Sequence, residues 1–244
     1  MDSQQRRLAQ QDQDPGLPGS AVPLVLLHGI QGTARTWDAI APRLRHSHPV
    51  VTPNLRGRAD ALHPDDPDRY RLEDFADDLS SVLAKVECPP VVVAWSMGVS
   101  VVLTLLRMQP AANIRALVLV SGSPCLGDEA VWFHSETIEQ LAVEAETRRN
   151  NLALVEAATP VAVAASWQHV KLADLRPVLG SVRQPTLVLH GASDDQSPVA
   201  HGRFMAKEIP GARLEIWEGV GHNPMAADPE RFSASVMEFA KSLT

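Results

Sequence analysis

The chain has 244 residues, and its hydrophobic content of 45% is enough to build one large α/β domain or two small ones. Its 22 basic and 29 acidic residues give a net charge of −7, and no basic run would follow a phosphate backbone, so nucleic acid is not expected as a partner. No apolar stretch approaches the ~20 residues that span a bilayer, and the N-terminus lacks the apolar region of a signal peptide, so we expect no membrane partner and a cytoplasmic location.

The sequence indicates no metal and no organic cofactor. The two cysteines, Cys88 and Cys125, are too few for a disulfide framework, lack the C-x-x-C spacing of a metal or redox site, and are predicted to be small buried residues. His46, His48 and His201 have no further ligands at metal spacing, and we predict that they lie on the surface.

The first 21 residues are rich in Gln, Asp, Pro and Gly, and we expect a loose tail or an edge strand there. After them, short apolar runs recur without polar alternation, which is typical of strands buried on both faces of a parallel sheet. These predicted strands cover residues 22–27, 50–52, 91–95, 116–120, 186–189 and 214–217.

Helical patterns separate the predicted strands. Residues 72–86 repeat apolar side chains at i, i+3, i+4 and i+7, and the opposite face, with aspartates at positions 74, 77 and 78, is predicted to be solvated. Residues 99–108 are apolar nearly all round, as in a central helix, and residues 232–240 form an amphipathic pattern. The alternation predicts the α/β class, with a mostly parallel twisted sheet and helices on both faces.

Residues 127–180 interrupt this alternation, because they contain helical patterns and no strand-like run. A helical insertion between two parallel strands favours a small lid over the carboxyl edge of the sheet, where such sheets bind ligands. The chain would then divide into a tail (1–21), a core (22–126 and 181–244) and this lid. Within the lid, the side chains that would line a pocket, or else form the lid's own core, are Trp132, Phe133 and Trp167.

Ser96 directly follows the predicted strand 91–95, with Ala94 two residues before it and Gly98 two residues after it. A serine between small residues at a strand-to-helix junction is typical of a sharp turn that strains the backbone and exposes the hydroxyl. The alternative is a serine that only caps the following helix. A serine hydroxyl becomes a good nucleophile when a base takes its proton and an acid orients that base.

Two later strand ends offer these partners. Asp194 lies on the loop after residues 186–189, and the glycine-flanked His222 lies on the loop after residues 214–217. The order serine, acid, histidine is that of the α/β hydrolases. His190, just before the acid loop, is interpreted as a strand-end residue.

Four segments in this order resemble the α/β-hydrolase family, from about Val22 to the C-terminus. Residues 28–30 are similar to the family's oxyanion loop, residues 95–98 to its nucleophile elbow, residues 191–198 to its acid loop, and residues 221–222 to its histidine loop. The resemblance implies that Ser96 is the nucleophile, His222 the general base and Asp194 the acid that orients it.

The resemblance also implies an oxyanion hole formed by the backbone N–H groups of Ile30 and Met97, with His28 as its brace. Trp95 would line the acyl pocket, or else belong to the core. Asp195 competes as the acid, but only Asp194 has the family's spacing from the glycine at 191 and the proline at 198.

Two further segments are informative. Residues 54–60 depart from the family's D-x-x-G-x-G-x-S pattern, because the first acid and the second glycine are missing, and this leaves the local geometry of the loop open. Residues 29–32 follow a predicted strand but do not match G-x-G-x-x-G, so dinucleotide binding is excluded.

The expected function is hydrolysis of a carboxylic ester through an acyl-enzyme, as in family members with small lids that act on methyl esters or lactones. A small-molecule ester or lactone is the expected substrate, and the same triad would also serve a lactonase, a thioesterase or a C–C bond hydrolase. Arg148, Arg149 and Arg176 are interpreted as solvated charges or, on a second hypothesis, as contacts for an acidic acyl-carrier protein. The rival class is a non-catalytic small-molecule receptor of the same fold.

Overall fold

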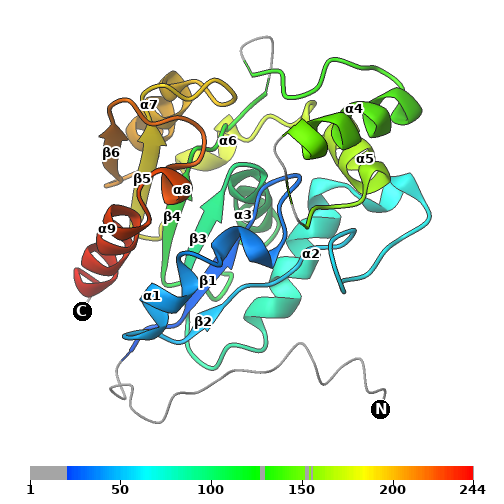
Figure 1. The fold of residues 1–244 in the computed structure, drawn as a ribbon. Coiled ribbons are helices and arrows are strands. Elements are labelled where there is room, and N and C mark those ends of the chain that lie inside the picture. The colour runs from blue at the N-terminus through cyan, green and yellow to red at the C-terminus, as the bar shows by residue number, and fades with distance from the viewer. Residues whose placement is uncertain (1–20, 127–129, 152–153, 155, 244) are drawn as a thin grey trace.

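The computed structural model describes residues 21–126, 130–151, 154 and 156–243. Within them, six strands form one sheet in the order β2-β1-β3-β4-β5-β6, and all neighbouring pairs are parallel (Figure 1). The predicted parallel sheet is confirmed, whereas the predicted tail lies outside the described residues up to position 20. The strands are β1 (Leu24–Leu27), β2 (Val50–Val51), β3 (Val91–Trp95), β4 (Ala116–Val120), β5 (Thr186–Gly191) and β6 (Arg213–Trp217).

Helices lie on both faces of the sheet, as the apolar patterns predict (Figure 1). They are α1 (Ala41–Arg45), α2 (Leu72–Leu83), α3 (Met97–Met108), α4 (Ile138–Asn151), α5 (Pro160–Val170), α6 (Arg176–Leu179), α7 (Val199–Glu208), α8 (Pro224–Ala227) and α9 (Pro229–Lys241). Two 3-10 turns, Ala34–Trp37 and Pro67–Arg69, complete the helical elements of the described chain. None of these helices combines the length and the apolar character that a bilayer crossing requires.

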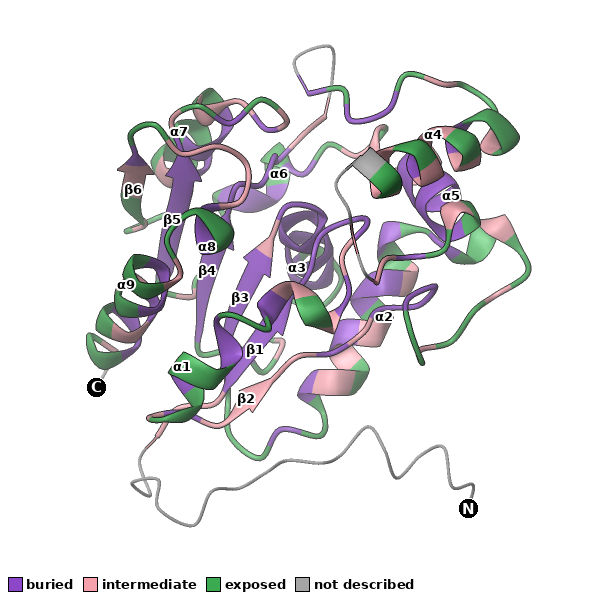
Figure 2. Ribbon diagram, viewed as in Figure 1, coloured by how far each residue is buried: buried purple, intermediate pink, exposed green. Residues whose placement is uncertain are grey.

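Alternate residues of each central strand face two separate apolar cores. In β1, Leu24 and Leu26 pack on the side of α1 and α9, whereas Val25 and Leu27 pack on the side of α2 and α3. All four side chains are fully buried (Figure 2). Because both faces of such a strand need apolar side chains, its sequence is a continuous apolar run.

The two outer strands do not have the predicted burial on both faces. In β6, Arg213 and Leu214 are exposed, and both residues of β2 are half-buried. An edge strand has a neighbour on one side only, so helices and loops cover it less completely than a central strand.

The acidic face of α2 is solvated only in part, because Asp77 is exposed as predicted whereas Asp74 and Asp78 bind an arginine. The almost fully buried guanidinium of Arg56 donates to Asp74 Oδ1 at 2.9 Å and to the two oxygens of Asp78 at 2.7 and 2.9 Å. Helical periodicity cannot reveal this contact, because Arg56 comes from the loop after β2. The ion pairs anchor this loop, residues 54–60, to α2.

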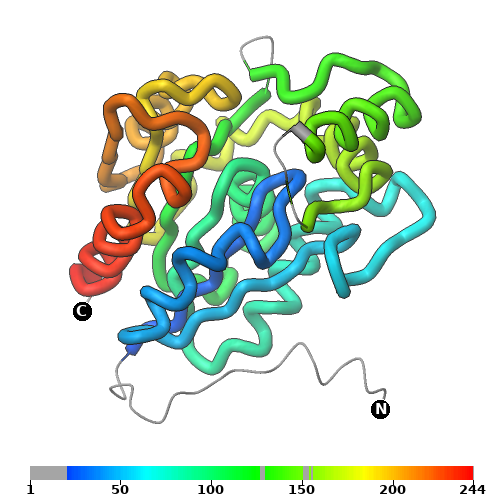
Figure 3. The backbone as a smooth tube through the Cα atoms, viewed as in Figure 1, coloured from blue at the N-terminus to red at the C-terminus, as the bar shows by residue number. Residues whose placement is uncertain are grey.

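The chain leaves the sheet after β4 and returns to it at β5, and the described residues between them form α4, α5 and α6 but no strand (Figure 3). The helices α4 and α5 pack against each other. Pro160, where the sequence suggests an interruption, is the first residue of α5, a position at which its missing N–H is harmless. The apolar stretch 152–158 lies partly outside the described residues.

His28 links the end of β1 to the loop after β2. Its ring is fully buried; Nδ1 lies 2.9 Å from the Gly29 carbonyl oxygen, and Nε2 lies 3.2 Å from the Leu55 amide. A carbonyl only accepts and an amide only donates, so Nδ1 carries the proton and Nε2 does not. Burial, together with the charge of Arg58, lowers the pKa of His28 to about 3.

The first turn of α3 approaches β1 closely at Gly98. A Cβ atom at this position would lie 2.9 Å from the Leu27 carbonyl oxygen and 3.1 Å from that of His28. Both are backbone atoms, so a larger residue would have to push β1 away from α3. The small residue two positions after Ser96 is therefore a packing requirement.

We expect Gly98→Ala to reduce the free energy of unfolding by about 1–3 kcal/mol, as overpacked substitutions do. Gly180→Ala is the matched control, since Gly180 has a helical φ of −67° and no heavy atom within 4 Å of an added Cβ. Urea unfolding measures both effects, and equal stability of the two variants would contradict the crowding between β1 and α3.

The low pKa of His28, about 3, also predicts a pH dependence of stability. Between pH 3 and the ordinary value of about 6.5, the unfolded chain holds a proton on this ring and the folded chain does not. The free energy of unfolding therefore falls as the pH drops through this window, by at most about 1.4 kcal/mol per pH unit from this group. His28→Gln removes the titration and should flatten the slope between pH 6 and pH 4 in urea unfolding; a slope equal to that of the wild type would refute the assignment.

Candidate active site

Ser96 occupies the tight turn between β3 and α3 in a strained backbone conformation. Its φ of 55° and ψ of −120° lie in a region that non-glycine residues rarely adopt, and its amide is held by the Val120 carbonyl oxygen at 2.9 Å. The residue stands at the N-cap of α3, yet its side chain makes no capping hydrogen bond. The alternative interpretation of Ser96 as a simple helix cap is therefore wrong.

Three side chains from three different loops meet at this turn. His222, between β6 and α8, places Nε2 2.9 Å from Ser96 Oγ, and its Nδ1 lies 3.0 Å from each carboxylate oxygen of Asp194. Asp194 comes from the loop after β5, and its side chain is fully buried. The parallel sheet makes this possible, because the carboxyl ends of β3, β5 and β6 open at the same edge.

The Asp194 carboxylate is held by several donors. Its Oδ1 accepts hydrogen bonds from the amides of Gln196 (2.9 Å) and Ser197 (2.8 Å). Burial alone would raise the pKa of this carboxyl, but hydrogen bonds from His190, His222 and Ser197 outweigh it and hold the pKa well below its ordinary value. The group is therefore ionised at neutral pH and faces the imidazole as an anion.

The neighbouring acid, Asp195, takes no part in this contact. It is exposed, whereas Asp194 is buried against His222. Asp194, which the spacing from Gly191 favours, is therefore the aspartate that contacts His222.

The two residues expected to form an oxyanion hole are brought to the same place. A Cβ at Gly29 would lie 3.1 Å from Ser96 Cβ, so the loop after β1 touches the serine turn. Ile30 follows Gly29, and Met97 follows Ser96 as the first residue of α3. Amides in the first turn of a helix have no partner within that helix, so the Met97 N–H is available to an anion.

Arg58 is a residue of this site that sequence reasoning missed. Its guanidinium is fully buried, donates to the carbonyl oxygens of Ile30 and Arg56 at 2.6 Å each, and lies 5.0 Å from the Phe75 ring centre. Burial lowers its pKa to about 10, so it remains charged at neutral pH. The signal in the sequence is the departure of residues 54–60 from the family pattern, because the arginine stands inside that loop.

Trp95 braces the histidine loop. Its Nε1 donates to the His222 carbonyl oxygen at 2.9 Å, and its ring centre lies 5.4 Å from that of the imidazole. The side chain is half-buried and packs on the core that faces α1 and α9. Of the two interpretations of Trp95, this packing favours the core position.

The three aromatic residues of the helical segment form one buried cluster. The ring centre of Trp167 lies 5.4 Å from that of Trp132 and 5.7 Å from that of Phe133. Trp132 Nε1 donates to the Gln196 carbonyl oxygen at 2.9 Å. The cluster thereby ties the helical segment to the loop that carries Asp194.

Arg148 is not the solvated charge that we predicted. It donates to the Trp132 carbonyl oxygen at 3.0 Å and to the side chain of Gln196, and its guanidinium lies 5.4 Å from the Phe133 ring centre. It comes from α4 and reaches these partners only in the folded chain, so it adds a second link between α4 and the acid loop.

A second contact between a serine and a histidine lies beside the first. His201 Nδ1, on α7, is 2.8 Å from Ser123 Oγ, whose hydroxyl donates in turn to Ser197 Oγ at 3.1 Å. Ser123 follows β4 and does not have the positive φ of Ser96. Because Ser123 has an ordinary backbone conformation and its Oγ also contacts the Ser197 hydroxyl, this pair differs from the Ser96–His222 pair.

Four surface and core assignments need correction. His48 and His201 are buried, not exposed, and His48 Nδ1 lies 3.0 Å from the Val22 carbonyl oxygen. Cys88 is exposed rather than buried, and Cys125 is half-buried. In the described part of the chain, no three potential ligand side chains are grouped as a metal site would need.

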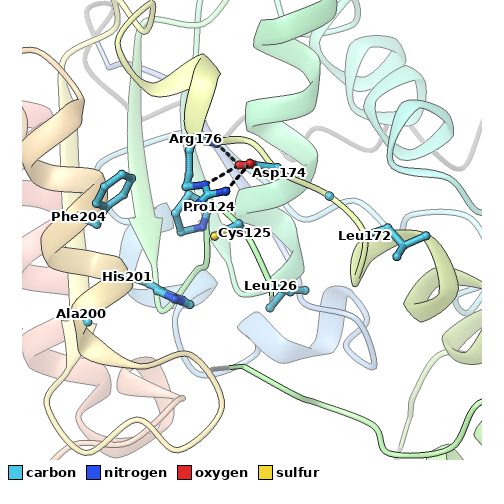
Figure 4. A pocket seen from close by; sticks show the side chains of 10 residues that line it. Pro124, Cys125, Leu126, Leu172, Asp174, Arg176, Ala200, His201 and Phe204 are labelled. Atoms are coloured by element: carbon cyan, nitrogen blue, oxygen red, sulfur yellow. Dashed lines mark hydrogen bonds and ion pairs between the residues drawn. The ribbon is translucent and has the colours of Figure 1, made fainter. Parts of the chain in front are cut away.

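A cavity of about 520 Å³ lies between the chain after β4, the α5–α6 connection and α7 (Figure 4). His201 and Phe204 form the α7 side, and Leu172 lies on the side of α5. Arg176 in its wall pairs with Asp174 at 2.6 Å. Through His201 and Ser123, this cavity borders the hydrogen bonds of the acid loop.

Comparisons with known proteins agree with this fold. The model of the alpha/beta hydrolase family matches residues 24–235. The pimeloyl-[acyl-carrier protein] methyl ester esterase of Aromatoleum aromaticum is 31% identical over 85% of this chain and 93% of its own length. Among solved structures, a hydrolase from Pseudomonas aeruginosa PA01 is 27% identical with a TM-score of 0.75, covering 91% of each chain.

An esterase from Exiguobacterium antarcticum has a TM-score of 0.78 at 21% identity, over 92% of this chain and 93% of its own, and it shows the fold alone. The family model covers most of the chain, and the parallel sheet and its connections have the expected architecture. This chain therefore belongs to the alpha/beta hydrolase family.

Proposed function

We propose that this protein is a serine esterase, with Ser96 as nucleophile, His222 as general base and then acid, and Asp194 as the anion that orients the imidazole. One observation carries the proposal. A strained serine has its hydroxyl 2.9 Å from an imidazole whose other nitrogen lies 3.0 Å from a buried carboxylate.

In the first half-reaction, Ser96 Oγ attacks the ester carbonyl carbon as its proton moves to His222 Nε2. The carbonyl electron pair shifts to the oxygen, which the Ile30 and Met97 amides stabilise as it becomes negative. Collapse of this intermediate breaks the bond to the leaving alkoxide, which takes the proton from His222. In the second half, a water molecule gives its proton to His222 and attacks the acyl-enzyme, and the acid leaves as Ser96 regains its proton.

The relatives support an ester substrate. The Aromatoleum protein is named for a methyl ester whose acid is attached to a carrier protein, and we infer a carboxylic ester of this general kind for this chain. A small ester is the simpler form of the proposal. A carrier-protein substrate rests on the relatives' names, because Arg148, Arg149 and Arg176 already bind groups within the chain.

We propose further that residues 127–180 act as a lid. The support is the aromatic cluster of Trp132, Phe133 and Trp167, which packs beside the acid loop and is linked to it through Gln196. These side chains are buried against one another, so they form the core of the lid, and the acyl group would meet only their outer edges.

Ser96→Ala is expected to lower kcat towards a p-nitrophenyl ester by about 10⁶-fold, as loss of the nucleophile does in other serine hydrolases. Ser123→Ala, the matched variant at the second serine–histidine contact, should lower it only a few-fold. Steady-state kinetics measures both effects. A series of esters of different acyl chain length, with a lactone and a thioester, then ranks the substrate classes by kcat/KM. Loss of activity in Ser123→Ala but not in Ser96→Ala would assign the nucleophile to Ser123; an inert wild type that binds a small ligand would favour the receptor class.

Asp194→Asn should lower kcat by about 10⁴-fold, because an amide cannot hold the imidazole in the required tautomer. Asp195→Asn is the control, since this exposed neighbour does not touch His222, and its kcat should stay close to that of the wild type. The same assay compares them, and a reversed order of the two variants would show that Asp195 is the acid.

A further inference from the structure

His190 lies against the acid loop and contacts the same carboxylate oxygen of Asp194 as His222 does. It is the fifth residue of β5, its side chain is fully buried, and its Nε2 lies 2.6 Å from the Ser197 carbonyl oxygen and 3.3 Å from Asp194 Oδ2. Both neighbours are acceptors, so Nε2 carries the proton. One N–H thus serves two oxygen atoms of the acid loop.

The opposite edge of the ring faces α7. A Cβ at Gly202 would lie 2.6 Å from His190 Nδ1, so the helix backbone packs directly on the ring. This nitrogen is buried and has no hydrogen-bond partner among the described residues. The hydrogen bonds of the ring are therefore made on the Nε2 side alone, toward the acid loop.

Ser197 holds the acid loop in place through three hydrogen bonds. Its amide donates to Asp194 Oδ1, its carbonyl accepts from His190, and its hydroxyl accepts from Ser123. The residue is fully buried, and every one of its polar atoms has a partner. Movement of His190 would therefore release both the Ser197 carbonyl and the turn that carries Asp194.

The two carboxylate oxygens of Asp194 are held in different ways. Two backbone amides fix Oδ1, whereas Oδ2 meets only the imidazoles of His190 and His222 in the described hydrogen bonds and ion pairs. Without His190, the orientation of Oδ2 would depend on His222 alone, which is the group that it must orient.

We propose that His190 is a positioning residue of the active site, which holds the Asp194 carboxylate at the angle that His222 requires. The inference rests on the proposed serine hydrolase mechanism. Apart from His190 and His222, the charged or titratable groups near this loop among the described residues are the exposed Asp195, Arg148, which binds Gln196, and His201, which lies behind Ser123.

His190→Leu removes the donor and keeps an apolar side chain in the core. We expect kcat to fall by about 10²-fold with little change in KM, the effect of a misplaced catalytic group. The acid limb of the kcat profile should also move to lower pH, because a carboxylate that is no longer held at the required angle stabilises the imidazolium form of His222 less.

Two matched variants separate positioning from stability. His190→Gln keeps an N–H at a similar reach and should restore most of kcat and the original pH profile. His48→Leu removes another buried imidazole that binds a backbone carbonyl, far from the site, and should lower the melting temperature without moving the pH profile. A role for His190 in stability alone predicts that His190→Leu behaves like His48→Leu, and that result would overturn the proposal.

Gly202→Ala gives a second route if His190→Leu does not fold. The added methyl group presses on the Nδ1 edge of the ring and should displace Nε2 from its present position against Ser197 and Asp194, lowering kcat and shifting the acid limb in the same direction. An unchanged kcat and pH profile in a folded Gly202→Ala would also overturn the proposal.

A readout without turnover distinguishes failure of this inference from failure of the proposed function. The proton between His222 Nδ1 and Asp194 gives a low-field NMR signal in a well-oriented pair, and it should shift upfield or broaden in His190→Leu but not in His48→Leu. An inactive wild type with this shift would refute the esterase and retain the positioning role. An active wild type whose signal does not change in His190→Leu would retain the esterase and refute the positioning role.

Discussion

The buried carboxylate of Asp194 is the interaction on which the rest of this site depends. A carboxylate without solvent is costly unless donors surround it, and here two amides and two imidazoles do so. These donors come from the acid loop itself, from β5 and from the loop after β6. The anion can therefore exist in this position only when β5 and β6 are paired and both loops are closed, which couples the charge of the site to the completion of the sheet.

The acid loop is also the point where the helical segment joins the core. Trp132 and Arg148 both bind Gln196, and the amide of Gln196 binds the carboxylate. The segment that contains α4 and α5 is thus connected to the proposed triad through the turn at Gln196. A change in the packing of α4 or α5 has a short path to the carboxylate, through hydrogen bonds rather than through the apolar core.

On the opposite side of the site, two arginines hold the loop that departs from the family pattern, in which Asn54 and Ala59 stand at the positions of the acid and the second glycine. Arg56 closes the loop onto α2 through Asp74 and Asp78, and Arg58 holds the Ile30 carbonyl from behind. Two buried guanidinium groups thus fix this loop to α2 and to the loop after β1. Among the described residues, Arg58 donates to carbonyl oxygens, and these, with the Phe75 ring, compensate its desolvation.

The sequence by itself determined the parallel sheet, its central strands and the serine turn, because these depend on local patterns: continuous apolar runs, and small residues around Ser96 that the contact of Gly98 with β1 requires. It also indicated which acid and which histidine stand at strand ends. Only the tertiary structure decided the environments of charged and polar side chains, such as Arg148, His201 and the aspartates of α2. Their partners lie far away in the chain, and burial of a charge depends on a partner that local periodicity does not contain. For the same reason, the sequence indicates only that His190 lies at the end of a strand, whereas the fold places it against the carboxylate of Asp194.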